Sequence, residues 1–439
     1  MKQFFQLYQT LIVALICISA NTIQAQDIFI NKDTTVNNNW ILPKGAILHF
    51  GSKGHINGTG TIKGGIIDAA LTQWLFETSL EVQPEATFGK DFSACWFGAG
   101  KVSDNYLPLQ KSIQTVVNNP QNLHHLFLPK GVYNYSQPLI IAQVYKGKYV
   151  GTSIHFYGES NFWDTETGSV LQYTGTDRFA LGLQLNKGSE IDHLQLRGQF
   201  QAPNGSDVNY FRTAFENFKD TKGKCAENYS GMVIDFDGSK NEGGSTGIFV
   251  HDMQVSNFSI DYSISPNSKT FNADILLFER IKCGDAQIGF ATGQAQEKGN
   301  VIRGIYSWGN IHTLFKCGYL GKGQAGNYVI DGGNIAGRCI QLFDINQQSW
   351  YSSSINHIYA ESLYRIGKFS TQIPLPISNC TFHFVLPKQV GQRVLIQADN
   401  NQVQFNNCIF RYYGTREAIK TIGKAIFNNC YFGGTQEKQ

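Results

Sequence analysis

The chain has 439 residues, with 36 Lys and Arg against 33 Asp and Glu, and a formal net charge of +3. This weak charge excludes the dense basic surface of a nucleic-acid-binding protein, but it is compatible with an acidic polysaccharide as the partner. Aromatic residues make up 13% of the chain and glycines number 45, which favours a protein built from strands and turns.

Residues 1–25 are predicted to be a secretory signal peptide. Lys2 supplies the positive end, Leu11–Ala20 is the apolar run, and Ala25 is the small residue for cleavage. The run is too short for a permanent span, and no later stretch is apolar over a membrane-spanning length. We therefore expect an exported protein, periplasmic or secreted, that is a monomer without a membrane span or an appended carbohydrate module.

Two segments precede the main repeat. Residues 26–90 hold short alternating apolar runs with many glycines, and we expect small N-terminal turns that cover the open end of a solenoid. Residues 91–175 contain Trp96-Phe-Gly-Ala-Gly100, and then Leu107–Val117, where apolar residues recur at helical spacing. Leu126-Phe-Leu-Pro-Lys-Gly-Val-Tyr133 follows as a strand. We predict a capping helix and the first solenoid turns here.

Residues 197–230 interrupt the strand pattern and are predicted to be an insertion between a third strand and a first strand. A short helix is expected at Arg212–Lys219, among several basic and aromatic residues. The functional hypothesis is a wall of a substrate groove, with Arg212 binding an acidic glycan. The alternative is a solvated loop that packs its own aromatic side chains.

One strand pattern recurs eight times in residues 231–432. It begins as Gly-Met-Val-Ile-Asp-Phe-Asp at 231–237, and successive starts are 25–30 residues apart. Each repeat holds a first strand, a loop, a second strand, a tight corner and a third strand. One turn cannot bury its apolar face alone, so turns must stack around a shared core. The predicted fold class is all-β, a β-helix solenoid that forms a single domain over 26–439.

The second corner carries a repeated motif: Asn379-Cys380-Thr-Phe382, Asn407-Cys408-Ile-Phe410 and Asn429-Cys430-Tyr-Phe432. Asn tolerates the left-handed backbone of a sharp corner, and stacked Asn side chains can hydrogen-bond between turns. Earlier turns hold other residues near this corner, which makes the ladder imperfect: Asp252, Arg280, Arg303, Asp331 and Asn356.

These corners, with the Phe-Gly-Ala and Leu-Pro-x-Gly-x-Tyr motifs of 91–175, resemble the pectate-lyase-like superfamily of right-handed parallel β-helix proteins that act on polysaccharides. The resemblance implies a substrate groove on the outer face of the first strands. It does not fix the chemistry, because that superfamily holds lyases, hydrolases, epimerases and phage tailspikes.

Eight cysteines follow the predicted signal peptide. Disulfides are the usual expectation for an exported protein. However, Cys380, Cys408 and Cys430 occupy equivalent places in consecutive turns, which predicts a stacked column of buried thiols. No Cys and His spacing resembles a zinc site.

The alternation of side chains along the first strands predicts which residues face outward and are candidates for the site. If Ile234 and Phe236 point inward, the outward side chains run from an acidic end to a basic end across the turns. The acidic end comprises Asp235, Asp237 and Asp261, and the basic end comprises His312, Lys316, Arg338 and Arg365. Leu314 should also point outward, and Tyr306 and Trp308 could stack on a sugar ring.

The basic end suits β-elimination on a uronic acid, by a carbon–oxygen lyase or a dehydratase. A cation neutralises the carboxylate, a base removes the C5 proton, and an acid assists the leaving C4 oxygen. Lys316 and Arg338 are the predicted base and carboxylate clamp, and His312 the predicted acid or subsite ligand. Arg365, Trp308, Tyr306 and Arg212 are the predicted substrate contacts.

Two alternatives remain open. Asp235, Asp237 and Asp261 could form a hydrolase site like that of polygalacturonases, although the signatures of that family are missing, or they could bind Ca²⁺ for a lyase. A non-catalytic glycan-binding β-helix is the other alternative. No cofactor besides possible Ca²⁺ is predicted.

Overall fold

The computed structural model describes residues 26–160, 167–176, 178–203, 225–226, 228–237, 244–266, 273–293, 297–318, 326–347, 352–384, 393–413 and 419–435. The chain divides into two compact units, one comprising residues up to Ala70 with Leu75–Lys90, and the other comprising Leu71–Trp74 with the chain from Asp91 onward. The predicted signal peptide lies outside the described residues, as do Arg212 and the predicted helix at Arg212–Lys219.

The first unit is a short coil of parallel strands. Its strands are β1 (Asp27–Ile30), β2 (Asp33–Thr35), β3 (Trp40–Ile41), β4 (Ile47–Phe50), β5 (His55–Asn57), β6 (Thr61–Lys63), β7 (Ile66–Asp68), β8 (Glu81–Gln83) and β9 (Ala86–Thr87). They pair in the orders β1-β4-β7-β9, β2-β5 and β3-β6-β8. The alternating apolar side chains of these runs, such as Leu48, Ile62 and Ile67, are 1% exposed and form its core. That these turns cover the end of a solenoid stays a prediction.

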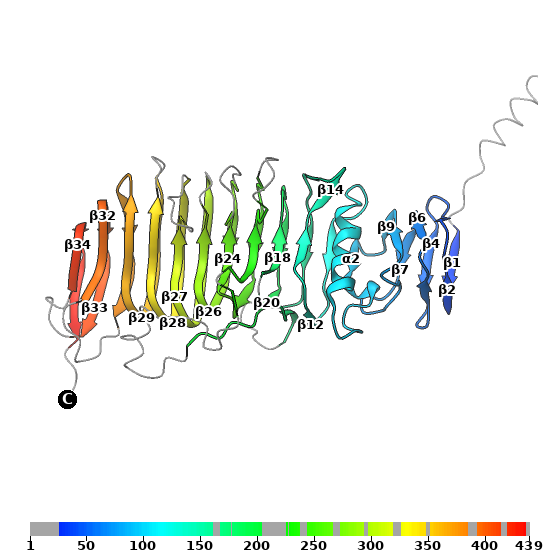
Figure 1. Cartoon of the computed structure of the whole chain (residues 1–439), viewed down its shortest axis with the longest axis horizontal. Coiled ribbons are helices and arrows are strands. Elements are labelled where there is room, and N and C mark those ends of the chain that lie inside the picture. Colours follow the sequence, from blue (N-terminus) through cyan, green and yellow to red (C-terminus); the bar gives the residue numbers. More distant parts are fainter. Residues whose placement is uncertain are drawn as a thin grey trace, which may run out of the picture. The chain divides into compact units, whose positions relative to one another are not determined.

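The second unit is a parallel β-helix in which three series of strands stack turn upon turn (Figure 1). The first-strand series contains β13 (Leu139–Ile141), β18 (Phe179–Leu183), β21 (Ser230–Ile234), β24 (Ile260–Ile264), the ends of β26 (Lys282–Thr292), β27 (Asn300–Cys317), β28 (Tyr328–Gln347) and β29 (Ser354–Thr371), and the starts of β32 (Arg393–Asn406) and β34 (Ile419–Asn428).

The other two series complete each turn. The second-strand series contains β10 (Asp91–Ser93), β11 (His125–Phe127), β16 (His155–Tyr157), β19 (Glu190–Asp192), β22 (Phe249–His251), β25 (Leu277–Glu279), the starts of β27, β28 and β29, β30 (Leu375–Ser378), and the ends of β32 and β34. The third-strand series contains β12 (Gly131–Tyr135), β17 (Ser169–Tyr173), β20 (Gln195–Arg197), β23 (Gln254–Ser256), the start of β26, the middles of β27, β28 and β29, β31 (Thr381–Phe384), β33 (Ile409–Tyr413) and β35 (Tyr431–Thr435). A hairpin of β14 (Gln143–Tyr145) and β15 (Lys148–Val150) stands apart.

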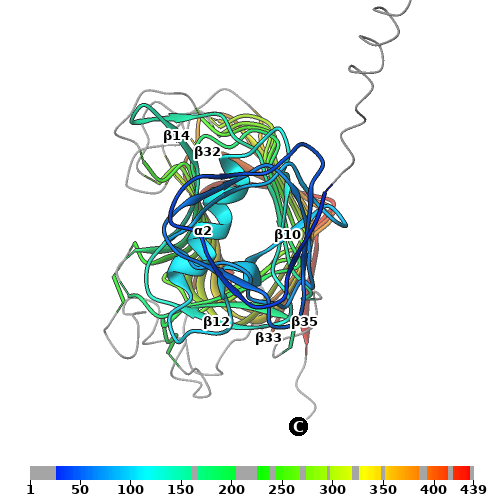
Figure 2. The same cartoon turned by 90° about the vertical axis from the view of Figure 1, so that its right-hand side faces the viewer.

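The turns share one apolar interior. Viewed end-on, the strands of the second unit overlie one another around it (Figure 2). An aromatic column runs through the first strands, with ring centroids 6.0 Å apart for Tyr262 and Phe290 and 5.9 Å apart for Phe315 and Phe343. Such stacking of equivalent side chains is what a 25–30 residue repeat predicts, because each turn places them over the previous turn.

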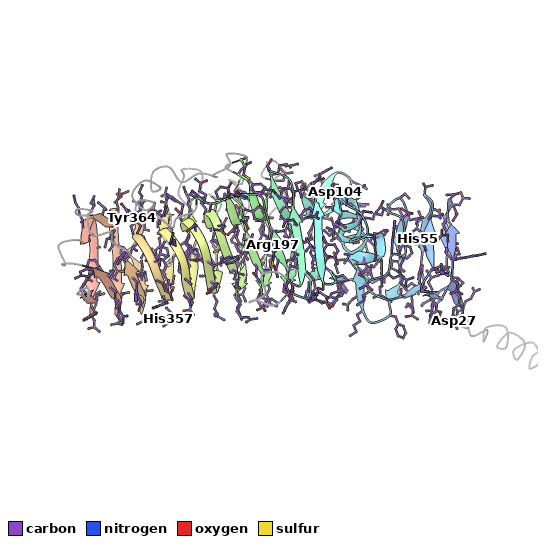
Figure 3. The ribbon with its side chains drawn as sticks, turned by 90° about the horizontal axis from the view of Figure 1, so that it is seen from below. Asp27, His55, Asp104, Arg197, His357 and Tyr364 are labelled. Carbon is purple, nitrogen blue, oxygen red and sulfur yellow. The ribbon has the colours of Figure 1, made fainter. Side chains whose placement is uncertain are left out.

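The predicted helix is confirmed as α2 (Tyr106–Val117), preceded by a short 3-10 helix, η1 (Ala94–Phe97). Its expected apolar stripe is buried, with Ile113, Val116 and Val117 all 0% exposed. Gln110 completes the open edge of β13: its Nε2 donates to Ile140 O at 3.0 Å, and its Oε1 accepts from Ile140 N at 2.8 Å. Asp104, labelled in Figure 3, accepts from Tyr106 N at 3.1 Å and so supports the start of the helix. Among the described residues, no helix has the length and apolar character needed to cross a membrane.

The predicted asparagine ladder is confirmed in the last turns. Asn407 Nδ2 donates to Asn379 Oδ1 at 3.5 Å, and Asn429 Nδ2 donates to Asn407 Oδ1 at 2.9 Å. All three have positive φ, between 50° and 56°. Upstream, the left-handed residues at this corner are His193, Asp252, Arg280, Gly304, Gly332 and His357. Arg303, Asp331 and Asn356 therefore lie one residue before the corner position.

The cysteine prediction is confirmed for the described residues, in which all eight cysteines are free. Cys380 is 1% exposed and Cys408 is 0% exposed. Burial and the contact between these two thiols raise the pKa of Cys380, so it remains a neutral thiol. The column therefore packs as small apolar groups.

Candidate functional site

The outer face of the first strands carries a pocket of about 510 Å³, which we call the first-strand pocket. Its described lining residues come from the hairpin and from four successive turns: Ile140, Tyr149, Arg178, Phe179, Asn228, Ser230, Val233, Phe236, Asp237, Ile260 and Pro266. A volume of this size is in the range of small-molecule sites. Apolar walls with a few polar groups at the rim also fit such a site.

The strands place the polar groups at opposite edges of this pocket. Arg178 and Asn228 directly precede β18 and β21, and the register pairs Phe179 with Ser230 in those strands. Asp237 follows the C-terminal end of β21, where its N–H donates to Gln184 Oε1 at 2.9 Å. A sugar over the face would thus have a guanidinium on one side and a carboxylate on the other.

Aromatic rings form the apolar part of the pocket. The rings of Phe179 and Phe236 lie 4.7 Å apart, and Tyr149 meets Phe236 edge-on at 6.5 Å. The Arg178 guanidinium carbon lies 5.7 Å from the Phe179 ring centroid. Aromatic faces of this kind can stack against the apolar C–H face of a sugar ring.

The alternation predicts that Phe236 points inward. This is wrong, because Phe236 lines the first-strand pocket on the outer face. The cause is Asp235, whose φ of 54° ends the strand and turns the chain. Asp235 is 0% exposed, and its carboxylate accepts from Leu185 N, Ser245 N and Ser245 Oγ. Burial raises the pKa of Asp235 despite these hydrogen bonds. Its predicted outward orientation is wrong.

Asp261 was also predicted to point outward, and this is wrong as well. It is 0% exposed within β24, and its Oδ2 accepts from Gly284 N of the third-strand series at 2.9 Å. Burial raises the pKa of Asp261 well above the ordinary value, and the neighbouring Asp285 adds to that rise. Of the three predicted aspartates, only Asp237 lines the pocket, so the structure does not gather them on the outer face.

Further along the same face lies a group of polar side chains on neighbouring turns, the first-strand polar patch, comprising His312, Thr313, Lys316, Gln341, Asp344 and Arg365. His312 Nδ1 is 2.8 Å from Thr313 Oγ1, which Gln341 Nε2 contacts at 3.5 Å. Lys316 Nζ lies 3.6 Å from Asp344 Oδ2. Arg365 is 9% exposed, and burial lowers the pKa of its guanidinium to about 10. The structure therefore brings together three predicted site residues: His312, Lys316 and Arg365.

Arg338 lies away from this patch. The register places Arg338 opposite Asn310, whereas Lys316 lies opposite Asp344. Arg338 therefore matches a position six residues before Lys316, up to about 20 Å away along a strand. Leu314 was predicted to point outward, and this is wrong, because it is 0% exposed.

Tyr306 and Trp308 belong to the third-strand part of β27. Lys282 Nζ lies 5.4 Å and 5.5 Å from the centroids of their rings. Neither residue is among the described residues that line the first-strand pocket.

The pocket and the patch share one column of outward positions. Val233 of the pocket aligns with Ser263, then Ala291, then Lys316, on successive turns. Neighbouring strands lie about 4.8 Å apart, so Lys316 is about 14 Å from Val233 across the turns. A chain-like ligand laid across the strands would reach both places.

Three residues that line the pocket, Tyr149, Arg178 and Asn228, are not among those that the sequence pattern predicts. Arg178 and Asn228 each stand just before a first strand, so aligning those strands would have placed both at one edge. The unequal loops before them hid this, and Tyr149 reaches the pocket from a hairpin that lies outside the repeat.

Comparison with known proteins adds little to this description. No protein-family profile and no curated protein sequence matches the chain. Among solved structures, the chain is similar to the crystal structure of the Agl-KA catalytic domain, with 14% sequence identity and a TM-score of 0.42. The match covers 79% of this chain and 66% of that one, less than two thirds of its length.

Proposed function

We propose that this protein is a carbon–oxygen lyase that acts by β-elimination on a uronic-acid-containing polysaccharide or oligosaccharide, with the first-strand pocket as its active site. The observation that carries the proposal is that pocket, where a guanidinium, a carboxylate and a phenol surround aromatic walls in about 510 Å³. Elimination on a uronate requires these kinds of group: a cation for the substrate carboxylate, a base and an acid.

The roles follow from the chemistry of each side chain. Arg178 binds the uronate carboxylate, because a guanidinium fork matches its two oxygens, and so makes the C5 proton more acidic. Asp237 takes that proton, and the C5–H electron pair forms the C4–C5 double bond as the C4–O bond breaks. The phenol of Tyr149 donates its proton to the departing oxygen. The products are an unsaturated uronate and a hydroxyl-bearing leaving group, or water from a terminal uronate.

Hydrolysis is less well supported by this pocket. A hydrolase of the usual type needs two carboxyl groups on either side of the scissile bond. Asp237 is the single carboxylate among the described residues that line the pocket, and Asp235 and Asp261 are buried. A calcium site built from Asp235, Asp237 and Asp261 is equally poorly supported, because only Asp237 lines the pocket and the other two are buried.

The polar patch then serves as an extension of the substrate groove. Lys316 and Arg365 supply positive charge about three or more turns from the pocket, where further uronate units of a chain would lie. The roles of base for Lys316 and clamp for Arg338 form a competing hypothesis, although Arg338 lies away from the patch.

The test is incubation with pectin, alginate and ulvan, measuring the ultraviolet absorbance of the unsaturated uronate and the size of the products. We expect absorbance to rise on one acidic glycan, and not on its carboxyl-methylated or neutral form. Chain shortening would identify a polysaccharide lyase, and unchanged length would identify a dehydratase.

Other outcomes contradict the proposal. New reducing ends without ultraviolet absorbance would show a hydrolase. Saturable glycan binding with no product on any substrate of the panel would favour the non-catalytic glycan-binding alternative.

A further inference from the structure

A second polar cluster lies on a different face, where the second strands meet their corner. It comprises His155, Glu190, Asp192, His193 and His251, and we call it the second-strand cluster. The register places His155 opposite Glu190, and Asp192 opposite His251, on three consecutive turns. Donor atoms of Asp192, His193 and His251 lie within 4.8 Å of one another, as do those of His155, Glu190 and Asp192.

Asp192 is the centre of this cluster. It is 3% exposed, and its Oδ2 lies 2.6 Å from His155 Nε2 and 3.7 Å from His251 Nε2. Its other oxygen, Oδ1, contacts His193 Nδ1. Three imidazoles from three turns therefore converge on one buried carboxylate.

The hydrogen bonds of His251 orient its second ring nitrogen into the cluster. His251 Nδ1 lies 2.8 Å from Asp252 Oδ2, and a carboxylate accepts only, so Nδ1 carries the proton. Asp252 is held by Arg280, whose Nε and Nη2 donate to its two oxygens at 2.8 and 2.7 Å. A carboxylate that holds the far nitrogen of an imidazole is the usual outer shell of a metal-bound histidine.

The near nitrogen then faces two acceptors. His251 Nε2 is 2.9 Å from Glu190 Oε1 and 3.7 Å from Asp192 Oδ2. A ring nitrogen against two carboxylates needs a positive charge beside it, which either a proton on Nε2 or a metal ion in its place supplies. With neutral imidazoles, the group of Glu190, Asp192, Asp252 and Arg280 has a net charge of about −2, which one divalent ion offsets.

We propose that the second-strand cluster binds a divalent transition-metal ion, with Asp192, His193 and His251 as ligands, and Glu190 and His155 beside them. Mixed imidazole and carboxylate donors favour zinc-like ions over Ca²⁺ or Mg²⁺, which prefer oxygen alone. Zinc lies about 2.0–2.2 Å from such donors, so its tetrahedral ligands are roughly 3.4 Å apart. Small side-chain rotations from the present spacing suffice. This site is independent of the proposed lyase pocket.

The first experiment measures Zn²⁺ binding to the tag-free chain after chelator treatment, by calorimetry and by the thermal unfolding midpoint. We expect about one Zn²⁺ per chain and a higher midpoint with Zn²⁺, because an ion that binds the folded state stabilises it. Ca²⁺ should give no such rise. Co²⁺ should give a visible absorption band characteristic of nitrogen and oxygen ligands. Absence of saturable Zn²⁺ binding, or stabilisation by Ca²⁺ in its place, would overturn the proposal.

Variants locate the ion. His193→Ala and His251→Ala should each weaken zinc affinity by about tenfold or more, and Asp252→Asn should do so by a similar factor through the orientation of His251. His357→Ala is the matched control, since His357 has the same corner conformation, with φ 55°, and also pairs with one aspartate, Asp331 at 2.8 Å (Figure 3). His193 is 44% exposed, so its variant should fold even if His251→Ala does not. Equal zinc affinity for His193→Ala and His357→Ala would place the ion elsewhere and refute the assignment.

Discussion

The first-strand and second-strand faces of the second unit share one backbone geometry, but their polar side chains are arranged differently. On the first-strand face, Tyr149, Arg178 and Asp237 stand around an open volume of about 510 Å³. On the second-strand face, Asp192 is 3% exposed and the imidazoles of His155 and His193 contact it directly.

This difference separates two kinds of ligand. Polar groups around an open volume can bind a molecule of sugar size, whereas groups already in contact leave room for an ion at most. The difference accompanies the connections: the hairpin of β14 and β15 stands beside the first strands, whereas from β19 onward a tight corner with one left-handed residue follows the second strands. Ligand size is thus set by the connections, since the strands of both faces are alike.

The largest expected effect comes from the pocket. Arg178→Ala and Asp237→Asn should each lower kcat/KM on the uronate substrate by about 100-fold or more, because both act on charge that develops in the transition state. Steady-state kinetics of ultraviolet product formation measure this. Arg303→Ala is the control, since Arg303 is 57% exposed on the second-strand face and should retain activity.

The shared interior should show the next largest effect. Cys408→Ala should lower the free energy of unfolding by about 1–3 kcal/mol, because it leaves a small cavity in the thiol column. Denaturant unfolding measures it, and activity per folded molecule should be unchanged. A bridge found between Cys380 and Cys408 by peptide mass mapping would instead contradict the thiol column.

The polar patch should contribute less than the pocket. Lys316→Ala should raise KM by about tenfold on long substrates and little on short ones, because Lys316 lies about 14 Å from the pocket column. Substrates of defined length give the comparison. If Lys316→Ala and Arg338→Ala each abolish turnover while Arg178→Ala does not, the pocket is not the active site and the competing assignment to Lys316 and Arg338 holds.

The smallest effect concerns a buried carboxyl without imidazole partners. Asp261 has a folded-state pKa raised well above its ordinary 3.8, so the folded protein binds a proton that the unfolded chain releases at neutral pH. Its contribution to stability is therefore present below about pH 4 and is lost as pH rises toward the folded pKa. Asp261→Asn should remove this loss, so the variant should gain stability relative to the parent between pH 4 and pH 7. The free energies of unfolding of variant and parent are measured at pH 4 and pH 7. The same difference between them at both pH values would contradict the prediction.

The candidate sites were predictable only in part from the sequence. Strand alternation correctly placed Lys316 and Val233 outward, because each lies inside a regular strand. It failed for Asp235 and Phe236, which follow the end of β21, where the left-handed backbone of Asp235 reverses the alternation. It also failed for Asp261, whose carboxylate accepts from Gly284 N although it lies within β24. Arg178 and Tyr149 lie outside the repeat altogether, so no periodicity could have selected them.

The sequence by itself determined the parallel β-helix, the helix at Leu107–Val117, the asparagine ladder and the free thiols, because each follows from a local pattern or from one residue recurring every turn. Only the tertiary structure decided what gathers on the outer faces. His155, Asp192 and His251 are far apart in the chain, and no short spacing predicts a metal site from them. Stacking brings them into contact, since parallel strands one turn apart lie about 4.8 Å from each other whatever the length of chain between them.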